Sequence, residues 1–318
     1  MTMTEMASAI LSDGPFFVGS HERPDGDSVG SSLALVRWLR TRGIESGAVF
    51  PNGVPAPYAS LPGATDTLGA FPSELSDAKL IVVDTPLPER VAGGSSLLER
   101  AAATLVIDHH PDNTSFGTVN LVDPTASSAA LLVYEVIVSV DGALDPATAS
   151  LLYVGVMTDT GGFRFGNTDA RTLRAAADLV AMGADPAELA DTVYGRQPMG
   201  RLRLLGMVLS SAETTLDGRV TFLTLSDEMR AATGSTGEEI EGLASYGRLI
   251  DTAEVSVLFR EEGENVRLSM RSKGGVDVNA LAKRLGGGGH RAASGALVAG
   301  PLKKARERVL EALEGLLS

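Results

Sequence analysis

The stretch Leu105-Val106-Ile107-Asp108-His109-His110 joins a short apolar run directly to three polar side chains. An apolar run of this length is typical of a strand that is buried on both faces of a parallel sheet. Similar runs occur at residues 15–20 and 79–83, and acidic residues follow each of them. Because a helical pattern at 28–42 separates the first two runs, we predict an α/β fold with a parallel sheet and helices on both of its faces.

The pattern of the chain changes twice after this first part. A further short strand is predicted at residues 48–50, and helical patterns then dominate at 127–140, 146–157, 169–182 and 186–194. Beyond about residue 213, alternation predicts strands at 219–225, 253–260 and 265–271, then a helix at 276–285 and a strand at 295–298. We therefore predict an N-terminal α/β domain at 1–185, a helical linker at 186–212 and a smaller α+β domain at 213–318.

The composition limits the kinds of site and ligand that this chain can have. Its 318 residues suit two domains, and the absence of cysteine excludes disulfides, zinc-thiolate sites and thiol nucleophiles. The net charge of −13 disfavours long nucleic acid, so a nucleic-acid ligand should be short or held by a local basic patch. No apolar stretch approaches the ~18–20 residues that cross a bilayer, and the N-terminus carries Glu5 and no basic segment. We expect a cytoplasmic protein without membrane association.

All four histidines lie in motifs built of metal-ligand or phosphate-loop residues. His21 opens the string His-Glu-Arg-Pro-Asp-Gly-Asp, His109 and His110 close the stretch quoted above, and His290 ends Gly-Gly-Gly-Gly-His. Histidine is the commonest side-chain metal ligand and the usual acid or base near neutral pH. Three of the four stand beside aspartates, which hard divalent cations prefer, so these strings indicate a metal site.

Five aspartates fall at or near the ends of predicted elements. Asp25 and Asp27 follow the first strand, Asp84 and Asp108 end later strands, and Asp159 ends a helical run. The ends of parallel strands meet at one edge of a sheet, where open α/β folds bind ligands. Carboxylates that converge there repel one another unless cations neutralise them. We therefore predict two divalent cations ~3.5–4 Å apart, the arrangement used for phosphoryl hydrolysis.

Simpler structural roles compete with metal binding at single positions. An aspartate at a strand end is often only a helix N-cap, and Asp84 before Thr85-Pro86 could be one. Asp108 is expected to support a histidine from behind instead of binding metal. Chance is a poor explanation for three such motifs at three strand ends, so the set as a whole favours a metal centre.

The run Gly286-Gly287-Gly288-Gly289-His290 indicates a second kind of site. Glycine has no Cβ, so backbone amides in such a run can approach an anion, although four glycines could equally form a flexible turn. Arg267, Arg271 and Lys273 bring cations to the neighbouring predicted hairpin, and alternation places Arg267, Ser269 and Arg271 on one face. Together these features predict an anion clamp.

These motifs resemble those of a known family. The strings His-X-X-Pro-Asp-Gly-Asp-Ser-X-Gly-Ser, Val-Val-Asp, Ile-Asp-His-His-Pro and Met-Thr-Asp-Thr-Gly-X-Phe-X-Phe resemble the four motifs of the DHH phosphoesterase superfamily. Arg271-Ser272-Lys273, Val276-Asp277-Val278 and the glycine-histidine string resemble its DHH-associated C-terminal domain. The resemblance extends over residues 14–317 and implies a Rossmann-like N-terminal domain. The two-domain form is similar to bacterial oligoribonucleases that also act as 3′-phosphoadenosine-5′-phosphate phosphatases.

The resemblance also implies roles for single residues in the N-terminal domain. The implied metal ligands are His21, Asp25, Asp27, Asp84, His109 and Asp159. His21 and Asp25 would hold one ion, Asp27, His109 and Asp159 would hold the other, and Asp84 would bridge the two. His110 would face the scissile phosphate, and Asp108 would support the histidines.

A further set of residues is implied to contact the substrate. Its members are Arg271, Gly287, Gly288, Gly289 and His290 in the C-terminal domain, and Ser127 and Ser128 in the N-terminal domain. The first five would hold the far phosphate or sugar of a nucleotide. Serine at 127 and 128 also suits a plain helix N-cap. Arg23 stands where family members usually have Asn, so the contacts of the first loop differ.

The implied activity is hydrolysis of short oligoribonucleotides and dinucleotides to mononucleotides, and of 3′-phosphoadenosine 5′-phosphate to AMP. The implied cofactors are two Mn²⁺ ions in a two-metal hydroxide mechanism, with Mg²⁺ or Co²⁺ as alternatives, and mixed His and Asp ligation leans away from Mg²⁺. The reach from the metal site to the glycine loop would select substrates of two to a few nucleotides and exclude long double-stranded nucleic acid. A homodimer is expected only by analogy.

Two other functions stay open at this point. A class II-type inorganic pyrophosphatase resembles the chain in the four N-terminal motifs, but the Ser-Arg-Lys-Lys-Gln string of that group is absent here. A catalytically inactive nucleotide-binding regulator would be favoured by the loss of a carboxylate, and none of the motif carboxylates is missing.

Overall fold

The computed structural model describes residues 2–11, 14–235, 240, 242–273, 275–289 and 291–317. The predicted substrate residue His290 lies outside the described residues. The chain divides into two compact units, Met1–Arg196 and Gln197–Ser318, which are called unit 1 and unit 2 below. Of the segment predicted as a helical linker, α7 (Pro186–Ala190) and a π-helical turn, η3 (Asp191–Gly195), belong to unit 1, and α8 (Met199–Ser210) belongs to unit 2.

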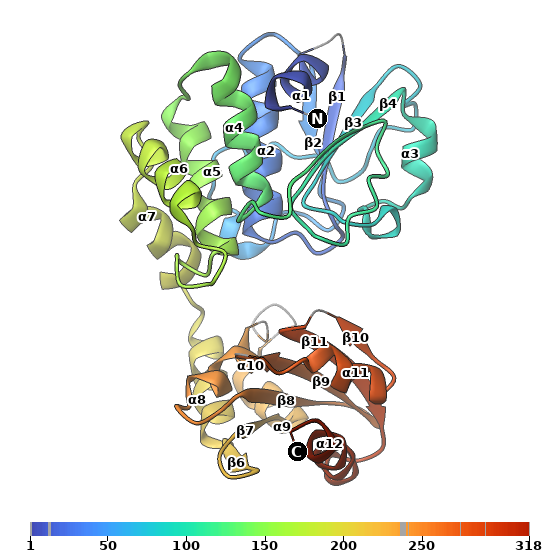
Figure 1. Ribbon diagram of the computed structural model, residues 1–318, viewed down its shortest axis with the longest axis vertical. Coiled ribbons are helices and arrows are strands. Elements are labelled where there is room, and N and C mark those ends of the chain that lie inside the picture. Colours follow the sequence, from blue (N-terminus) through green and yellow to red (C-terminus); the bar gives the residue numbers. More distant parts are fainter. Residues whose placement is uncertain are drawn as a thin grey trace. The chain divides into compact units, whose positions relative to one another are not determined.

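Unit 1 is built on a five-stranded parallel sheet with the order β2-β1-β3-β4-β5 (Figure 1). Its strands are β1 (Phe16–Gly19), β2 (Ser46–Ala48), β3 (Lys79–Val83), β4 (Ala103–Asp108) and β5 (Val119–Val122). This confirms the predicted α/β class. The chain runs from β1 to β2 on one side and returns to β3 on the other, so the strand order reverses between β1 and β3. At such a reversal the carboxyl ends of the strands leave a crevice in which α/β proteins bind ligands.

Helices cover one face of this sheet (Figure 1). They are α1 (Met3–Ile10), α2 (Gly26–Arg40) and α4 (Ala129–Asp141), and α5 (Pro146–Asp159) and α6 (Ala170–Ala181) pack on these helices as a further layer. Ile81 and Ile107 point into the core that these helices form with the sheet. On the other face, Leu80 packs against Leu97 of the short α3 (Ser96–Arg100) and Val82 against Val91, so both faces are covered. Two 3₁₀ turns, η1 (Ala56–Tyr58) and η2 (Pro88–Arg90), complete the unit.

The sequence-based prediction did not include α1 and α3, and it differs from the structure at three further places in unit 1. The prediction missed β5, of which only Leu121 is buried, because a half-exposed edge strand shows no continuous apolar run. The strand predicted at 48–50 lies at Ser46–Ala48, and beyond it Phe50 donates its N–H to the carbonyl of Leu68 instead of to the sheet. The helix predicted at 186–194 ends at Ala190 and continues as the π-helical turn.

Unit 2 contains a six-stranded mixed sheet with the order β10-β11-β9-β8-β7-β6. Its strands are β6 (Glu213–Thr215), β7 (Val220–Leu225), β8 (Val255–Glu262), β9 (Asn265–Ser272), β10 (Gly288–Gly289) and β11 (Ala293–Ala299). The predicted hairpin is confirmed as β8–β9, with Glu262 opposite Asn265 and a tight turn between them. Only β7 and β8 run parallel; the other pairs are antiparallel.

Helices also cover both faces of the unit 2 sheet. The helices of this unit besides α8 are α9 (Asp227–Thr233), α10 (Leu243–Tyr246), η5 (Gly247–Leu249), α11 (Val278–Arg284) and α12 (Leu302–Leu317). Leu281 of α11 and Val309 of α12 pack with Val257 on one face. Leu204 of α8 packs with Leu258 on the other face. The predicted smaller α+β domain is therefore a mixed sheet between two helical layers.

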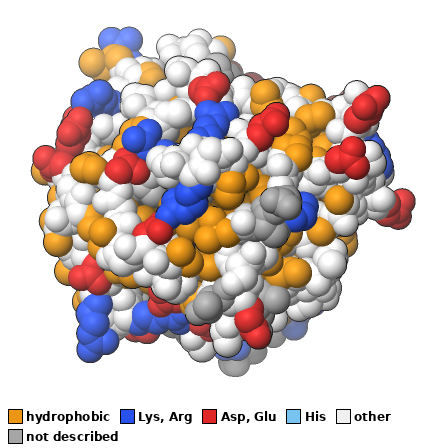
Figure 2. All heavy atoms as spheres, turned by 90° about the horizontal axis from the view of Figure 1, so that it is seen from above, with side chains coloured by type: hydrophobic (Ala, Val, Ile, Leu, Met, Phe, Trp, Pro, Cys, Tyr) orange, Lys and Arg blue, Asp and Glu red, His pale blue; other side chains and the backbone are white. Residues whose placement is uncertain are grey.

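Hydrophobic side chains are interspersed with charged ones on the face drawn in Figure 2, and no histidine is visible on it. Within the part of the chain that the structure describes, no helix combines the length and the apolarity needed to cross a bilayer.

Candidate metal centre and active site

Six predicted metal ligands converge where the strands of the unit 1 sheet end. They belong to three overlapping groups, and the ligand atoms within each group lie within 4.8 Å of one another. The groups are His21, Asp25 and Asp84; Asp27, His109 and Asp159; and Asp84, Asp108, His109 and His110. Asp84 belongs to two of the groups, as does His109. The topology brings together residues that are up to 138 positions apart in the sequence, from Asp159 back to His21.

Asp84 lies at the middle of this arrangement, immediately after β3. It is buried and has a positive φ of 51°, a backbone conformation that is strained for a residue other than glycine. The hydroxyl of Ser28 donates a hydrogen bond of 2.6 Å to its Oδ2. Asp84 Oδ2 lies 3.5 Å from His21 Nε2, and Asp84 Oδ1 lies 3.5 Å from His109 Nε2. Its two oxygens thus face different ligand groups, as the oxygens of a bridging carboxylate do.

The carboxylate of Asp27 is fixed by the N-terminus of α4. The backbone N–H of Ala129 donates to Oδ2 at 2.6 Å and that of Ala130 donates to Oδ1 at 2.8 Å. The Ser31 hydroxyl adds a third hydrogen bond to Oδ1 at 3.2 Å. Unpaired N–H groups at a helix N-terminus favour a negative charge, so α4 holds Asp27 in one orientation beside His109.

Asp25 is a helix N-cap, the role that the sequence analysis gave as the alternative to metal binding for an aspartate at a strand end. It is the N-cap of α2, and its Oδ1 accepts hydrogen bonds from the N–H groups of Asp27 and Ser28 at 3.0 and 3.1 Å. The cap uses one carboxylate oxygen, so capping and ligation are compatible in the same residue. These two hydrogen bonds also hold the loop that carries Asp25 against the start of α2.

The atoms around the His109 imidazole show whether the residues at the strand ends suit a cation. Its Nε2 is buried and has no hydrogen-bond partner among the described residues. Three carboxylate oxygens surround it, at 3.5 Å from Asp84, 3.6 Å from Asp159 and 3.9 Å from Asp27. These distances are too long for good hydrogen bonds. A buried imidazole nitrogen with three carboxylate oxygens around it provides the ligand atoms of a divalent cation that binds both His and Asp. The residues therefore fit a metal ion.

The pKa values reflect the cost of gathering these carboxylates without a cation. Burial, together with the charge of Asp84, raises the pKa of Asp159 to about 7. Burial and the same charge raise the pKa of Asp27 well above its ordinary value. Burial alone would lower the pKa of His109, but its interaction with Asp84 and the charge of Asp27 raise it to about 10. Burial opposes ionisation of Asp84 as well, yet the two neighbouring histidines hold its pKa below the ordinary value. These buried carboxylates and histidines therefore favour a proton or another positive charge among them.

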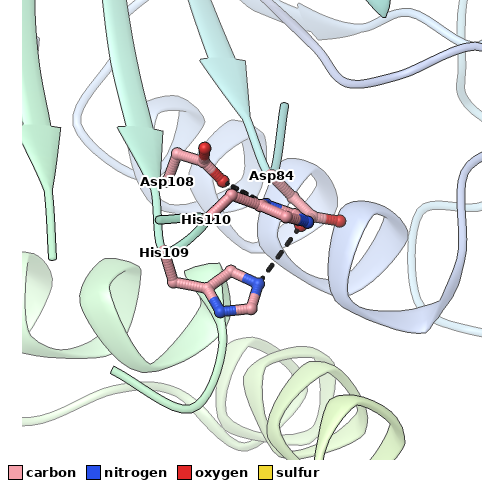
Figure 3. Close-up of side chains that lie close together, drawn as sticks. All are labelled: Asp84, Asp108, His109 and His110. Atoms are coloured by element: carbon pink, nitrogen blue, oxygen red, sulfur yellow. Dashed lines mark hydrogen bonds and ion pairs between the residues drawn. The ribbon is translucent and has the colours of Figure 1, made fainter. Parts of the chain in front are cut away.

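His110 points toward the same centre but has a different support (Figure 3). Its Nδ1 lies 2.8 Å from Oδ1 of the fully buried Asp108 and 3.7 Å from Oδ1 of Asp84. The other oxygen of Asp108 accepts a hydrogen bond of 2.6 Å from the side-chain amide of Asn113. Both oxygens of Asp108 are thus engaged by protein groups, which suits the predicted supporting role. Sequence reasoning missed Asn113, whose only signal is an Asn three residues after the second histidine.

The two predicted serines at the start of α4 differ in their surroundings. Ser128 is the N-cap of α4, and its Oγ accepts a hydrogen bond of 3.1 Å from the N–H of Leu131. Ser127 is buried, and its hydroxyl has no partner among the described residues. The amide of Asn167 donates to the carbonyls of Ser127 and Asp159, which ties this loop to the end of α5 beside the metal centre.

Arg271 and the glycine run meet at one end of the unit 2 sheet. Arg271 of β9 pairs with Ala293 of β11, and the next β11 residue, Ser294, pairs with Gly289 of β10. A Cβ at Gly287 would lie 2.1 Å from a β11 carbonyl oxygen, and one at Gly289 would lie 2.7 Å from another. The close approach of β10 to β11 therefore requires glycine at these two positions, whether or not the loop binds an anion.

All three cations predicted for an anion clamp have partners within the protein. Arg271 donates to the carbonyl oxygen of Met270 at 3.0 Å. Arg267 forms an ion pair of 2.9 Å with Glu262 across the hairpin. The ammonium group of Lys273 donates to the carbonyl oxygens of Arg248, Ile250 and Asp251 at 3.0 to 3.3 Å. These partners compete with an anion for Arg267 and Lys273, which the sequence could not show, because alternation gives the face of a side chain but not its partner.

Comparison with known proteins gives matches over nearly the whole chain. Residues 15–156 match the DHH family N-terminal domain, and residues 219–318 match the DHHA1 domain. The chain is 36% identical to the bifunctional oligoribonuclease and PAP phosphatase NrnA of Thermus thermophilus, over 98% of this chain and 92% of that protein. It is 31% identical to the Bacillus subtilis protein of the same name, over 93% of each. The crystal structure of an exopolyphosphatase-related protein from Bacteroides fragilis superposes with a TM-score of 0.93 at 26% identity, covering 98% of this chain and 95% of that one.

Proposed function

Because the chain belongs to the DHH family and carries a DHHA1 domain, we propose that it is a metal-dependent oligoribonuclease and phosphatase. It would hydrolyse short oligoribonucleotides, dinucleotides included, to mononucleotides, and 3′-phosphoadenosine 5′-phosphate (PAP) to AMP. The observation that carries the proposal is the convergence of the His and Asp groups around Asp84. The substrate class comes from relatives that match along nearly their full length and are named for these two activities.

We assign the ligands of two divalent cations from the groups at the strand ends. His21 and Asp25 would hold one ion, the group of Asp27, His109 and Asp159 would hold the other, and Asp84 would serve both. The opposed directions of the two Asp84 oxygens support the shared role. Mixed imidazole and carboxylate donors favour Mn²⁺ over Mg²⁺, which prefers oxygen ligands.

Such a pair of ions would activate water at neutral pH and stabilise negative charge on phosphoryl oxygens. The chain contributes orientation and proton control around that chemistry. Asp108 holds the Nδ1 side of the His110 ring, and we assign the Nε2 side to the contact with a substrate phosphate or leaving oxygen. The buried strand ends exclude bulk water from one side of the centre, which strengthens these interactions.

In unit 2 we propose that Arg271 and the exposed Gly288 contact the nucleotide away from the scissile bond. Gly288 supports this role because, unlike its two neighbours, it has open space at the position of a Cβ. Ser127, whose buried hydroxyl has no partner within the described part of the chain, is the better candidate of the two serines for a phosphate contact. A cytoplasmic location and a homodimer complete the proposal; light scattering on the purified chain tests the dimer.

The decisive experiment compares PAP, a dinucleotide and pyrophosphate as substrates, each with Mn²⁺ and with EDTA. We expect Mn²⁺-dependent turnover of the first two, and a steep fall in rate as RNA lengthens from two to about ten nucleotides, since an acidic chain disfavours long nucleic acid. Asp84→Ala should abolish every activity. Arg271→Ala should mainly raise KM and leave metal binding intact, as the loss of uniform binding does.

Each alternative function makes a different prediction in the same experiment. Pyrophosphate as the best substrate would favour a pyrophosphatase. No metal-dependent turnover of any substrate would favour an inactive nucleotide-binding regulator. The names of the relatives and the complete set of motif carboxylates argue against both.

A further inference from the structure

A hydrogen-bond network lies behind His110, and it includes Asn113, which belongs to none of the candidate metal groups. Asp108 is fully buried and accepts from two sides, with His110 Nδ1 at 2.8 Å and Asn113 Nδ2 at 2.6 Å. An ionised carboxylate has no hydrogen to donate, so its bond to His110 requires the proton on Nδ1. The tautomer of the His110 ring is therefore set by the group on its Nδ1 side (Figure 3).

The side chain of Asn113 is itself held from three directions. Its Nδ2 donates to Asp108 and, at 3.2 Å, to the carbonyl of Thr85. Its Oδ1 accepts a hydrogen bond of 2.6 Å from the N–H of Ser115. Because an amide oxygen cannot donate, the Ser115 contact fixes which end of the amide faces Asp108.

The loop backbone supports this arrangement. The N–H of Asn113 donates to the carbonyl of His110 at 3.2 Å, and Ser115, whose N–H donates to the Asn113 side chain, has a positive φ of 53°. Asn113 thus links the turn after β3, which carries Asp84, to the end of β4, which carries both histidines. Hydrogen bonds to a charged acceptor at this distance are among the stronger ones in proteins.

We propose that Asn113 is a positioning residue, whose side-chain amide fixes Asp108 and, through it, the Nδ1–H tautomer and the ring orientation of His110. His110 Nε2 then has the lone pair or proton that contacts the substrate phosphate. That last step rests on the proposed function, whereas the tautomer and the orientation do not.

The first test reads the tautomer directly by nitrogen NMR of the imidazole rings. The chain has four histidines, so the ring signals of the full-length protein in EDTA are few, and His110→Gln identifies the one from His110. At a pH where this ring is neutral, we expect the Nδ1–H form in the unchanged chain. Asn113→Ala and Asn113→Leu should both shift the ring toward the Nε2–H form; the second keeps the volume, so a packing defect cannot explain a shared result.

Asn120 provides a matched control. It is half-buried like Asn113, and its amide also braces a loop, donating to the carbonyl of Gly117 at 2.7 Å and accepting from the N–H of Gly117 at 2.9 Å. Asn120→Ala should therefore leave the His110 signal as it is in the unchanged chain. An unaltered tautomer in both folded Asn113 variants, or an equal shift in Asn120→Ala, would overturn the positioning role.

The second test separates the His110 path from an effect on the metal centre. With Mn²⁺ and PAP or a dinucleotide, we expect kcat of the Asn113 variants to fall about 10- to 100-fold, the range for groups that orient a reacting side chain. KM and Mn²⁺ affinity should change less than about threefold, since the ligand set is intact. A fall in Mn²⁺ affinity that matches the fall in kcat would overturn the proposal, because Asn113 would then act on Asp84 through Thr85. If the unchanged chain showed no turnover, the proposed function would fail, and the NMR result would still decide the tautomer.

Discussion

Asp159 offers a direct measure of the cost of burying an ionised carboxylate among the candidate metal ligands. Its carboxylate lies in one group with Asp27 and His109, and burial raises its pKa from 3.8 to about 7. A raised carboxyl pKa means that the folded chain binds this proton more tightly than the unfolded chain does. The free energy of unfolding should therefore fall as the pH rises from 3.8 to about 7, and stay low above it.

Replacing Asp159 by Asn should remove this loss of stability. At about 1.4 kcal/mol per pKa unit, the shift sets a ceiling of about 4 kcal/mol above pH 7. Neighbouring groups titrate together with Asp159, and its side chain is 27% exposed, so we expect about half of the ceiling, ~2 kcal/mol. In EDTA at pH 8, Asp159→Asn should thus be more stable than the unchanged chain by this amount, and the difference should disappear near pH 4.

Urea unfolding followed by tryptophan fluorescence measures this difference. Trp38 is the only tryptophan of the chain and lies buried in α2, so its signal reports on unit 1. Asp123→Asn is a matched control, because the Asp123 side chain is also 27% exposed but its pKa is shifted in the opposite direction. Burial there is outweighed by hydrogen bonds from Thr125 and Arg171, which lower the pKa of Asp123. This variant should be less stable than the unchanged chain at pH 7, and the deficit should vanish as the pH falls through the lowered pKa.

The reasoning would be refuted if Asp159→Asn were no more stable than the unchanged chain in EDTA at pH 8. Added Mn²⁺ should reverse the order of the two proteins, because a ligand that binds only the folded state stabilises the chain with the complete site. If Mn²⁺ stabilised both proteins equally, Asp159 would not be a ligand.

Three further predictions concern single contacts. Ser28→Ala removes the hydroxyl that orients the Asp84 carboxylate, and Mn²⁺ affinity measured by calorimetry should fall about 10-fold. Ser32→Ala removes a buried hydroxyl that has no partner among the described residues, and it should not change this affinity. Gly287→Ala puts a Cβ 2.1 Å from a backbone oxygen and should cost about 2–3 kcal/mol in thermal unfolding followed by circular dichroism. Gly288→Ala has open space and should cost much less; equal losses would disprove the packing role of Gly287. Lys273→Met should cost about 1 kcal/mol of stability without altering KM for a dinucleotide, and a raised KM would restore Lys273 to the substrate site.

The sequence predicted much of unit 1 because its strands are short apolar runs that end in chemically distinctive residues. Burial on both faces of a parallel sheet requires such runs, so they are visible without the fold. The edge strand β5 was not visible, because a half-exposed strand needs no continuous apolar run. Likewise, alternation placed Arg267 on the correct face of its strand, but the partner Glu262 could be identified only from the hairpin register.

The sequence by itself identified the histidines and aspartates that converge at the strand ends, since they stand together in short strings whose local spacing is set by the strand and the following loop. Only the tertiary structure decided which of these side chains lie next to one another. The crossing of the chain between β1 and β3 brings Asp84 between His21 and His109, and the N-terminus of α4 takes hold of Asp27 from 102 residues away. The role of Asn113 was likewise hidden, because a hydrogen bond depends on distance and direction in space and leaves no periodic trace in the sequence.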